Sequence, residues 1–139
     1  MVESKLPLDE FKAYASIKGW VIHYGRMDYA NLEGLVVPDK IHLFVLSQNF
    51  TANFTDFGVA NNSCQCSLLL VKQGDIGVTH QVKYETNIKQ LVFESNEMAV
   101  YLKNCGTWRP TAWSSISVLN KMDDTLDGLN INATLLGHV

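Results

Sequence analysis

Cysteine and histidine are the side chains of this sequence best suited to bind a metal ion. Cys64 and Cys66 stand two residues apart, and His80 and Cys105 could complete a tetrahedral site with them. Structural zinc sites usually combine two close pairs of ligands, whereas here one close pair is followed by two single residues in different predicted elements. Because the chain continues from Cys66 into the apolar run "SLLLV", we interpret both cysteines as small buried side chains of a strand. We therefore predict no metal and no cofactor.

The remaining titratable residues form no recognisable catalytic pattern. The histidines show neither HxH nor HExxH spacing, and the sequence has no G-x-S-x-G, Walker A or G-x-G-x-x-G motif. Asp123, Asp124 and Asp127 fall within "DDTLDG", whose composition is typical of a turn. His23 and His42 fall in predicted strands, where a histidine with a structural role is commoner than a ligand. We predict no catalytic residues and a protein that is not an enzyme.

Four tripeptides have the Asn-x-Ser/Thr form of a glycosylation acceptor, and they begin at Asn49, Asn53, Asn61 and Asn132. Such a tripeptide is modified only in a secretory compartment. The N-terminal "MVESKLPLDEFK" is polar and mixed in charge, without the apolar centre of a signal peptide. We expect the tripeptides to reflect Asn- and Thr-rich loops and strand surfaces, so a secreted glycoprotein is the weakest functional hypothesis.

The composition is that of a folded domain with an ordinary surface. The chain has 139 residues, 47% of them hydrophobic, and a net charge of −3, which suits one domain over residues 1–139. An acidic balance without runs of Lys or Arg argues against general binding to nucleic acid or to anionic membranes. No apolar stretch approaches the roughly 18 residues of a membrane span. The 3 cysteines argue against a disulfide framework and favour a reducing cytoplasm.

The hydrophobic periodicity predicts two helices and five strands in the order α, β, β, β, α, β, β. The helices are expected over residues 6–20, with Pro7 in the first turn, and over Tyr84–Asn104. The strands are expected at Trp20–Tyr24, Lys40–Ser47, Cys64–Gln73, Thr111–Met122 and Leu129–Gly137. This order favours an α+β fold, with a mainly antiparallel sheet of about four to five strands and two helices packed on one face.

Two long loops are predicted within this single domain, at about residues 25–39 and 48–63. In the second loop, Phe50, Phe54 and Phe57 have the i, i+4, i+7 spacing of one helical face. The Asn, Thr, Ala and Asp residues between them are poor helix formers, so we expect a single turn or a loop fixed by three aromatic rings. The loops either fold back onto the core of the chain or contact another chain.

Three stretches together resemble one protein family. They are "IHYGRMDYANLEG" with the following strand "IHLFVL", then "FTDFGV…CSLLLVKQGDI…YETNIKQL", and finally "MDDTLDGLNINATLL". Over about residues 20–136 the chain is similar to the small α+β proteins of tailed bacteriophages that cap the tail tube or join it to the head, the tail terminators and head–tail connectors.

The resemblance implies a structural subunit of the virion, assembled in the cytoplasm of the bacterial host. Such a subunit forms a homo-oligomeric ring, commonly a hexamer, that contacts tail-tube, head-completion or other neck proteins. DNA passes through the lumen without sequence-specific recognition, and no membrane is involved. Interfaces favour aromatic residues and arginine, so the candidate contact residues are Arg26, Tyr29, Phe50, Phe54 and Phe57. The alternative is a small cytoplasmic enzyme or a ligand- or metal-binding α+β domain.

Overall fold

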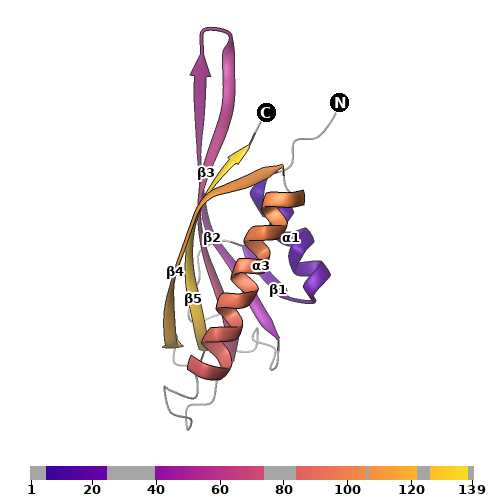
Figure 1. Ribbon diagram of the computed structural model, residues 1–139, viewed down its shortest axis with the longest axis vertical. Helices are drawn as coiled ribbons and strands as arrows, with labels where there is room; N and C mark the ends of the chain where they lie inside the picture. Colours follow the sequence, from indigo (N-terminus) through magenta and orange to yellow (C-terminus); the bar gives the residue numbers. More distant parts are fainter. Residues whose placement is uncertain (1–5, 25–39, 74–83, 106, 122–125, 138–139) are drawn as a thin grey trace.

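The computed structural model of the protein describes residues 6–24, 40–73, 84–105, 107–121 and 126–137. The elements follow the predicted order along the chain: α1 (Pro7–Lys18), β1 (Val21–Tyr24), β2 (Ile41–Thr55), β3 (Gly58–Gln73), a π-helical turn η2 (Tyr84–Ile88), α3 (Lys89–Cys105), β4 (Trp108–Lys121) and β5 (Leu126–Gly137). The five strands form one sheet in the order β1-β2-β3-β5-β4, and α1 and α3 cover one of its faces (Figure 1). The predicted α+β architecture is therefore confirmed.

The sheet is antiparallel except at one edge. β1 lies parallel to β2, with Val21 opposite His42, whereas the β2–β3, β3–β5 and β5–β4 pairs are antiparallel. Because β1 has four residues and β2 has fifteen, β1 covers only the beginning of β2. The rest of that edge of β2 has no neighbouring strand in the described sheet.

Both helices pack as their sequences predict, although the second one begins with the π-helical turn η2 and becomes an α-helix only at Lys89. In α1, Pro7 occupies the first turn, and the Asp9 carboxylate accepts a hydrogen bond from the Leu6 backbone N–H at 3.0 Å. Gly19, with φ of +72°, ends the helix in the left-handed conformation that glycine adopts without steric cost. The inward-facing side chains recur at helical spacing and are buried: Phe11, Tyr14 and Ala15 in α1, and Leu91, Met98 and Leu102 in α3.

A register shift in β2 changes which residues face the helices. Leu68 of β3 pairs with Val45, but the next residue, Ser67, pairs with Ser47, so Leu46 is passed over. A residue inserted in this way reverses the alternation of side chains along the strand. Before the shift, odd-numbered residues such as Leu43 are in the core. After it, even-numbered residues face the helices, as shown by the Gln48 side chain, which accepts a hydrogen bond from the Leu8 backbone N–H of α1 at 3.1 Å.

The core lies between the sheet and the two helices. Its largest fully buried side chains come from every layer, and include Phe11, Leu43, Leu68, Leu70, Leu91, Met98, Leu102 and Ile131. A buried carboxylate joins α1 to the start of β4, because Glu10 accepts hydrogen bonds from the backbone N–H groups of Thr107 and Trp108. Neither helix of the described residues has the length and hydropathy that crossing a bilayer requires.

The prediction of a loop at residues 48–63 is wrong. These residues continue β2 to Thr55 and begin β3 at Gly58, so that one long hairpin replaces the expected loop. The residues between the phenylalanines alternate with a period of two, which suits a strand better than a helical turn. Gly58, with φ of +124°, occupies a backbone conformation that a side chain would strain. The other predicted loop, residues 25–39, lies outside the described residues.

Candidate functional site

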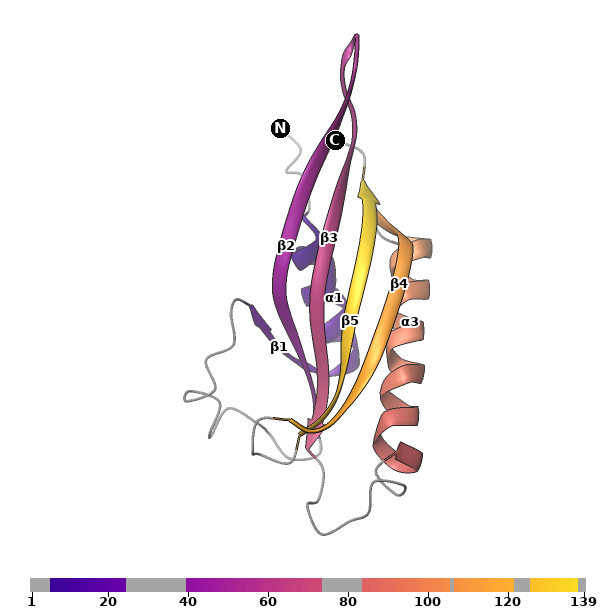
Figure 2. The same ribbon diagram turned by 90° about the vertical axis from the view of Figure 1, so that its left-hand side faces the viewer.

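The far end of the β2–β3 hairpin projects from the body of the molecule, as both views of the ribbon show (Figures 1 and 2). We call residues 51–61 the arm. β5 reaches along β3 only as far as Asn62, and β1 pairs with β2 only as far as Val45. In the described sheet, the two strands of the arm therefore pair only with each other. A two-stranded ribbon without a covered face is marginally stable in water.

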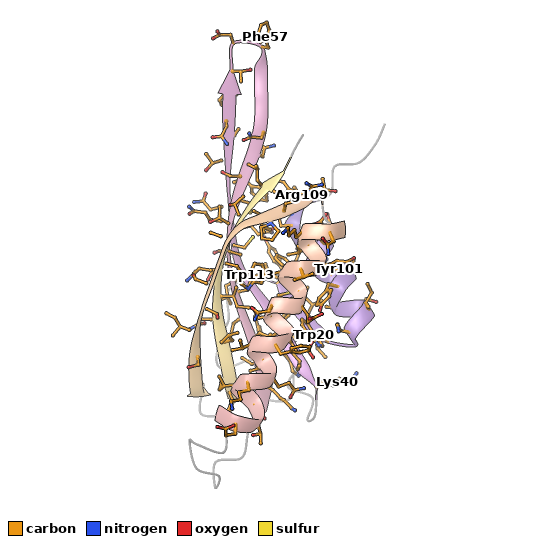
Figure 3. All side chains as sticks on the ribbon, viewed as in Figure 1. Trp20, Lys40, Phe57, Tyr101, Arg109 and Trp113 are labelled. Carbon is orange, nitrogen blue, oxygen red and sulfur yellow. The ribbon has the colours of Figure 1, made fainter. Side chains whose placement is uncertain are left out.

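Aromatic side chains without a covering partner lie along the arm. Phe57 lies at the tip (Figure 3), where it is 100% exposed, and Phe54 is 75% exposed. Below them, Phe50 is 45% exposed, and its ring packs edge-on against Trp108 with the ring centroids 5.9 Å apart. The tip also carries one acidic residue, Asp56. Apolar groups gathered on an exposed element mark a contact surface.

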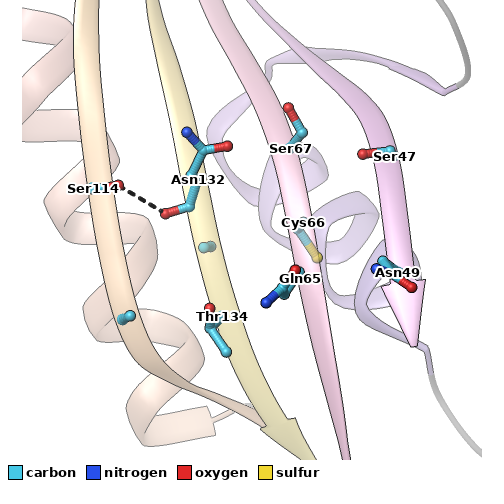
Figure 4. Close-up of a pocket in the computed structure, with 10 residues that line it drawn as sticks. Ser47, Asn49, Gln65, Cys66, Ser67, Ser114, Asn132 and Thr134 are labelled. Carbon is cyan, nitrogen blue, oxygen red and sulfur yellow. Dashed lines mark hydrogen bonds between the residues drawn. The ribbon is translucent and has the colours of Figure 1, made fainter. Parts of the chain in front are cut away.

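The middle of the sheet face opposite the helices is polar and uncharged. Directly paired residues share a face, and the pairs Ser47 with Ser67 and Asn49 with Gln65 extend across β2 and β3. The face contains a shallow hollow of about 470 Å³ (Figure 4). Its lining residues are Ser47, Asn49, Gln65, Cys66, Ser67, Ala112, Ser114, Asn132, Ala133 and Thr134. The hollow offers hydrogen-bonding groups and no charge.

The four Asn-x-Ser/Thr tripeptides have a structural origin on this face. Asn49, Asn53, Asn61 and Asn132 all lie in strands rather than in loops. Polar residues on one face of a strand stand two positions apart in the sequence. When Asn occupies one such position and Ser or Thr the next, the two residues form an Asn-x-Ser/Thr tripeptide. The Asn53 amide also donates a hydrogen bond to the Asn61 side-chain oxygen, at 2.6 Å across the arm.

The two close cysteines lie in the core, as the sequence predicts for small apolar side chains. Cys64 and Cys66 are buried on the helix side of β3, with their Sγ atoms 3.5 Å apart. Burial raises the pKa of both thiols, so both stay protonated near neutral pH. Within the residues that the structure describes, no three His, Cys, Asp or Glu side chains gather in a group that could hold a metal ion. His80 and the side chain of Cys105 lie outside this part of the chain.

The structure joins two histidines that the sequence could not pair. The parallel register of β1 and β2 brings His23 Nε2 to 3.1 Å from His42 Nδ1, and the His23 ring stacks on Phe44 at a centroid distance of 4.5 Å. Burial, together with the charge that His42 can carry, lowers the pKa of His23. A hydrogen bond between two imidazoles needs one N–H and one lone pair, so the contact requires that at least one of the two rings is neutral. The pair connects β1 to β2 at the edge of the sheet.

The acidic residues of "DDTLDG" are only partly described. Asp127 is fully buried, and it accepts a hydrogen bond from the Asn87 side chain at 2.7 Å, which connects β5 to η2. Asp123 and Asp124 lie outside the described residues. The sequence predicts a turn that includes Asp127, whereas the structure places this residue in β5, opposite Lys72 of β3.

A second apolar surface, which the sequence did not reveal, lies between α3 and β4. We call it the α3–β4 depression. It has a volume of about 240 Å³, and its lining residues are Ala99, Val100, Lys103, Pro110, Thr111, Ala112 and Trp113. Val100 is 51% exposed because it lies outside the buried stripe of α3. The signal in the sequence was weak, since Val100 fits an ordinary amphipathic helix and its neighbours in β4 are distant along the chain.

The structure describes three of the five predicted contact residues. Phe54 and Phe57 are exposed on the arm, and Phe50 lies partly against Trp108. Arg26 and Tyr29 fall outside the described residues. Comparison with known proteins supplies no family, because no family model and no curated protein matches this chain.

Proposed function

We propose that this protein is a structural subunit of a bacteriophage tail or neck, where copies of it form a ring that ends the tail tube or joins the tail to the head. The observation that carries the proposal is the projecting arm with its exposed phenylalanines. Full burial of one phenylalanine side chain contributes about 1.5–3 kcal/mol. This free energy is available to an interface because Phe57 and Phe54 make little contact with the rest of the described chain.

The arm supports assembly better than it supports catalysis. A catalytic element needs groups that transfer protons or attack a substrate, whereas the arm carries Asn, Thr and Phe with one aspartate. Aromatic residues are enriched at protein interfaces and at the positions that dominate their binding free energy. A long ribbon also reaches beyond the body of its own subunit, which is the geometry that contact with a neighbouring subunit requires (Figure 2).

The polar sheet face fits a structure through or past which DNA moves. The hollow on this face is lined by hydroxyl, amide and apolar groups, without a lysine or arginine. Cations that neutralise phosphates provide most of the affinity of proteins for DNA. A hollow without them would not hold a passing duplex. The resemblance to tail terminators and head–tail connectors in three stretches of sequence supports the same assignment.

Light scattering after size-exclusion chromatography, followed by negative-stain imaging, tests the proposal. We expect a ring, with six copies as the expected number, either for the isolated protein or after addition of a tail-tube protein. A protein that stays monomeric under both conditions would contradict the proposal. Stoichiometric zinc in the purified protein would instead favour the alternative of a metal-binding domain.

A pair of variants separates assembly from folding. We expect Phe54→Ser with Phe57→Ser to reduce the oligomeric mass while the melting temperature of the monomer stays the same, because both side chains are exposed. Ile17→Ser is the matched control, since Ile17 is 68% exposed on α1 and lies away from the arm. A fall in melting temperature without a change in mass would assign the phenylalanines to the folding of the monomer.

A further inference from the structure

We propose that the tip of the arm of one copy binds in the α3–β4 depression of a neighbouring copy, with Phe57 in the depression and Asp56 beside Lys103. The inference rests on the proposed function, because it specifies the contact that would hold the ring together. The occupant of the α3–β4 depression is thus a second copy of this chain.

The size and chemistry of the depression suit one aromatic ring. Its lining is mostly apolar, with Val100, Pro110 and Trp113 among the residues that form it. A cavity of about 150 Å³ in a protein core accommodates benzene, and the depression offers about 240 Å³. Phe57 would therefore exchange full exposure to water for contact with an indole, a pyrrolidine ring and an aliphatic side chain.

The charges at the two surfaces are complementary. Asp56 is the one acidic residue of the arm, and it directly precedes Phe57. Lys103 lines the depression, and Arg109 precedes Pro110 at the start of β4 (Figure 3). When the phenylalanine enters the depression, the adjacent carboxylate arrives beside Lys103, whereas Arg109 is opposite Leu136 and faces the other side of the sheet. Such complementarity fixes the orientation of an incoming partner and opposes docking of the wrong one.

The backbone beside the depression is also open to a partner. β4 is the last strand of the described sheet and pairs only with β5. Its outer edge therefore presents backbone groups to which an extended segment can add. The strands of the arm have free edges of their own beyond the ends of β1 and β5. When the arm of one copy reaches the depression of another, a free strand edge of the arm therefore lies beside the free edge of β4.

The contact cannot form within one chain. The arm projects from the body, and Phe57 lies at its far end, whereas the depression is on the body beside α3 (Figures 1 and 3). The two surfaces are also different parts of the molecule, so the same contact can repeat from one copy to the next. An interface of this kind closes into a ring when the rotation between copies allows it. A contact between two arm tips would instead stop at a dimer.

Cysteine cross-linking between separately labelled copies tests this contact. The variants Phe57→Cys and Val100→Cys, each in a Cys105→Ser background, are prepared alone, mixed and oxidised. We expect the mixture to give a disulfide-linked dimer that contains one copy of each variant, and we expect neither variant alone to cross-link. Ile17→Cys, mixed with Phe57→Cys, is the control for random collision because Ile17, which is 68% exposed on α1, is more accessible than Val100, which is 51% exposed.

The outcomes distinguish the contact from the function. Cross-linking of Phe57→Cys with itself, or cross-linking with Ile17→Cys to the same extent, would overturn the proposed contact. Oligomers seen by light scattering without cross-linking in the mixture would overturn the contact and leave the ring intact. A protein that remains monomeric would overturn both.

A charge exchange provides the second measurement. We expect Asp56→Lys or Lys103→Glu alone to raise the protein concentration at which the oligomer dissociates roughly tenfold or more, because each places like charges together. The double variant Asp56→Lys with Lys103→Glu should recover most of this loss. Lys12→Glu on the exposed side of α1 is the control for a change in net charge. A double variant no better than either single variant would overturn the pairing of Asp56 with Lys103.

Discussion

The two ends of the β2–β3 hairpin have the same backbone pairing and opposite surroundings. At the near end, Leu43 and Leu70 face each other in the core, and Phe44 and Leu69 are buried on the other face of the sheet. At the far end, Asn53 is opposite Asn61, and Phe54, which is opposite Val59, is 75% exposed. Hydrogen bonds between strands are thus available to both ends. The side chains decide which end stabilises the fold and which end is available for contact.

This difference implies unequal stability along one hairpin. The near end is stabilised by burial on both faces, whereas the arm has cross-strand pairs of about 0.2–1 kcal/mol each. Local opening of a structure takes place where few apolar contacts are lost. The arm is therefore expected to open while the body stays folded. The near end of the hairpin is expected to open only when the body unfolds. Substitutions along the hairpin measure how sharply the two ends differ.

The largest effect is expected for Leu70→Ala at the near end. Leu70 is fully buried among side chains of the sheet and helices, so truncation removes apolar contacts and leaves a cavity. We expect a loss of about 3 kcal/mol in the free energy of unfolding, within the usual range of roughly 2–5 kcal/mol. Urea denaturation of the monomer measures it. A loss below about 1 kcal/mol would show that the near end is not the stable part of the hairpin.

A smaller effect is expected where the arm joins the body. Phe50→Ala removes the edge-on contact with Trp108, whereas Phe54→Ala removes a side chain with little contact. We expect Phe50→Ala to cost about 1 kcal/mol and Phe54→Ala less than about 0.5 kcal/mol of unfolding free energy. The two variants are matched controls for each other in the same denaturation experiment. Equal losses would place the boundary of the arm elsewhere.

The histidine contact predicts a pH dependence that belongs to the near end. The pKa of His23 is lowered in the folded protein by burial and by the charge that His42 can carry, so below pH 6.5 the unfolded state binds more protons. Stability is therefore fully present above pH 6.5 and decreases as the pH falls below it. We expect His23→Gln to make this decrease shallower in urea denaturation between pH 7.5 and 5.5. If the free energy of unfolding decreases equally steeply with falling pH in the wild type and in His23→Gln, His23 is not the cause of the decrease.

The smallest effect is expected in the middle of the arm. Asn53→Ala removes the hydrogen bond from the Asn53 amide to Asn61, which is exposed to water on the ribbon. We expect a change of a few tenths of a kcal/mol in global stability, together with faster hydrogen exchange of the backbone amides of the arm. Exchange measured by mass spectrometry on arm peptides tests it, with peptides from β5 as the internal control. Faster exchange in β5 as well would show that the arm is coupled to the body.

Local patterns in the sequence were sufficient for most of the fold. The apolar spacing in α1 and α3 predicted both helices, and alternation or apolar runs predicted the positions of the strands, because burial requires a period that matches each element. The same reasoning placed Cys64 and Cys66 in a strand of the core. These predictions depended on contacts that any helix or half-buried strand makes.

The long hairpin was missed because its signal is ambiguous. Phe50 and Phe54 are four residues apart, a spacing that places side chains on one face of a helix and also on one face of a strand. The polar residues between them argued against a helix, but a strand usually requires a buried face, and this one has none for much of its length. The shift at Leu46 further obscured the alternation, since the face turned to the helices changes there from odd to even positions.

The sequence by itself determined the α+β class and the order of its elements, since both follow from spacing between near neighbours. The tertiary structure decided which strands are adjacent, and this placed His23 beside His42 and created a depression from α3 and β4. The tertiary structure also decided that Phe54 and Phe57 lie outside the body rather than in the core. The physical reason is that pairing and burial depend on residues far apart in the chain, whose meeting no local pattern encodes.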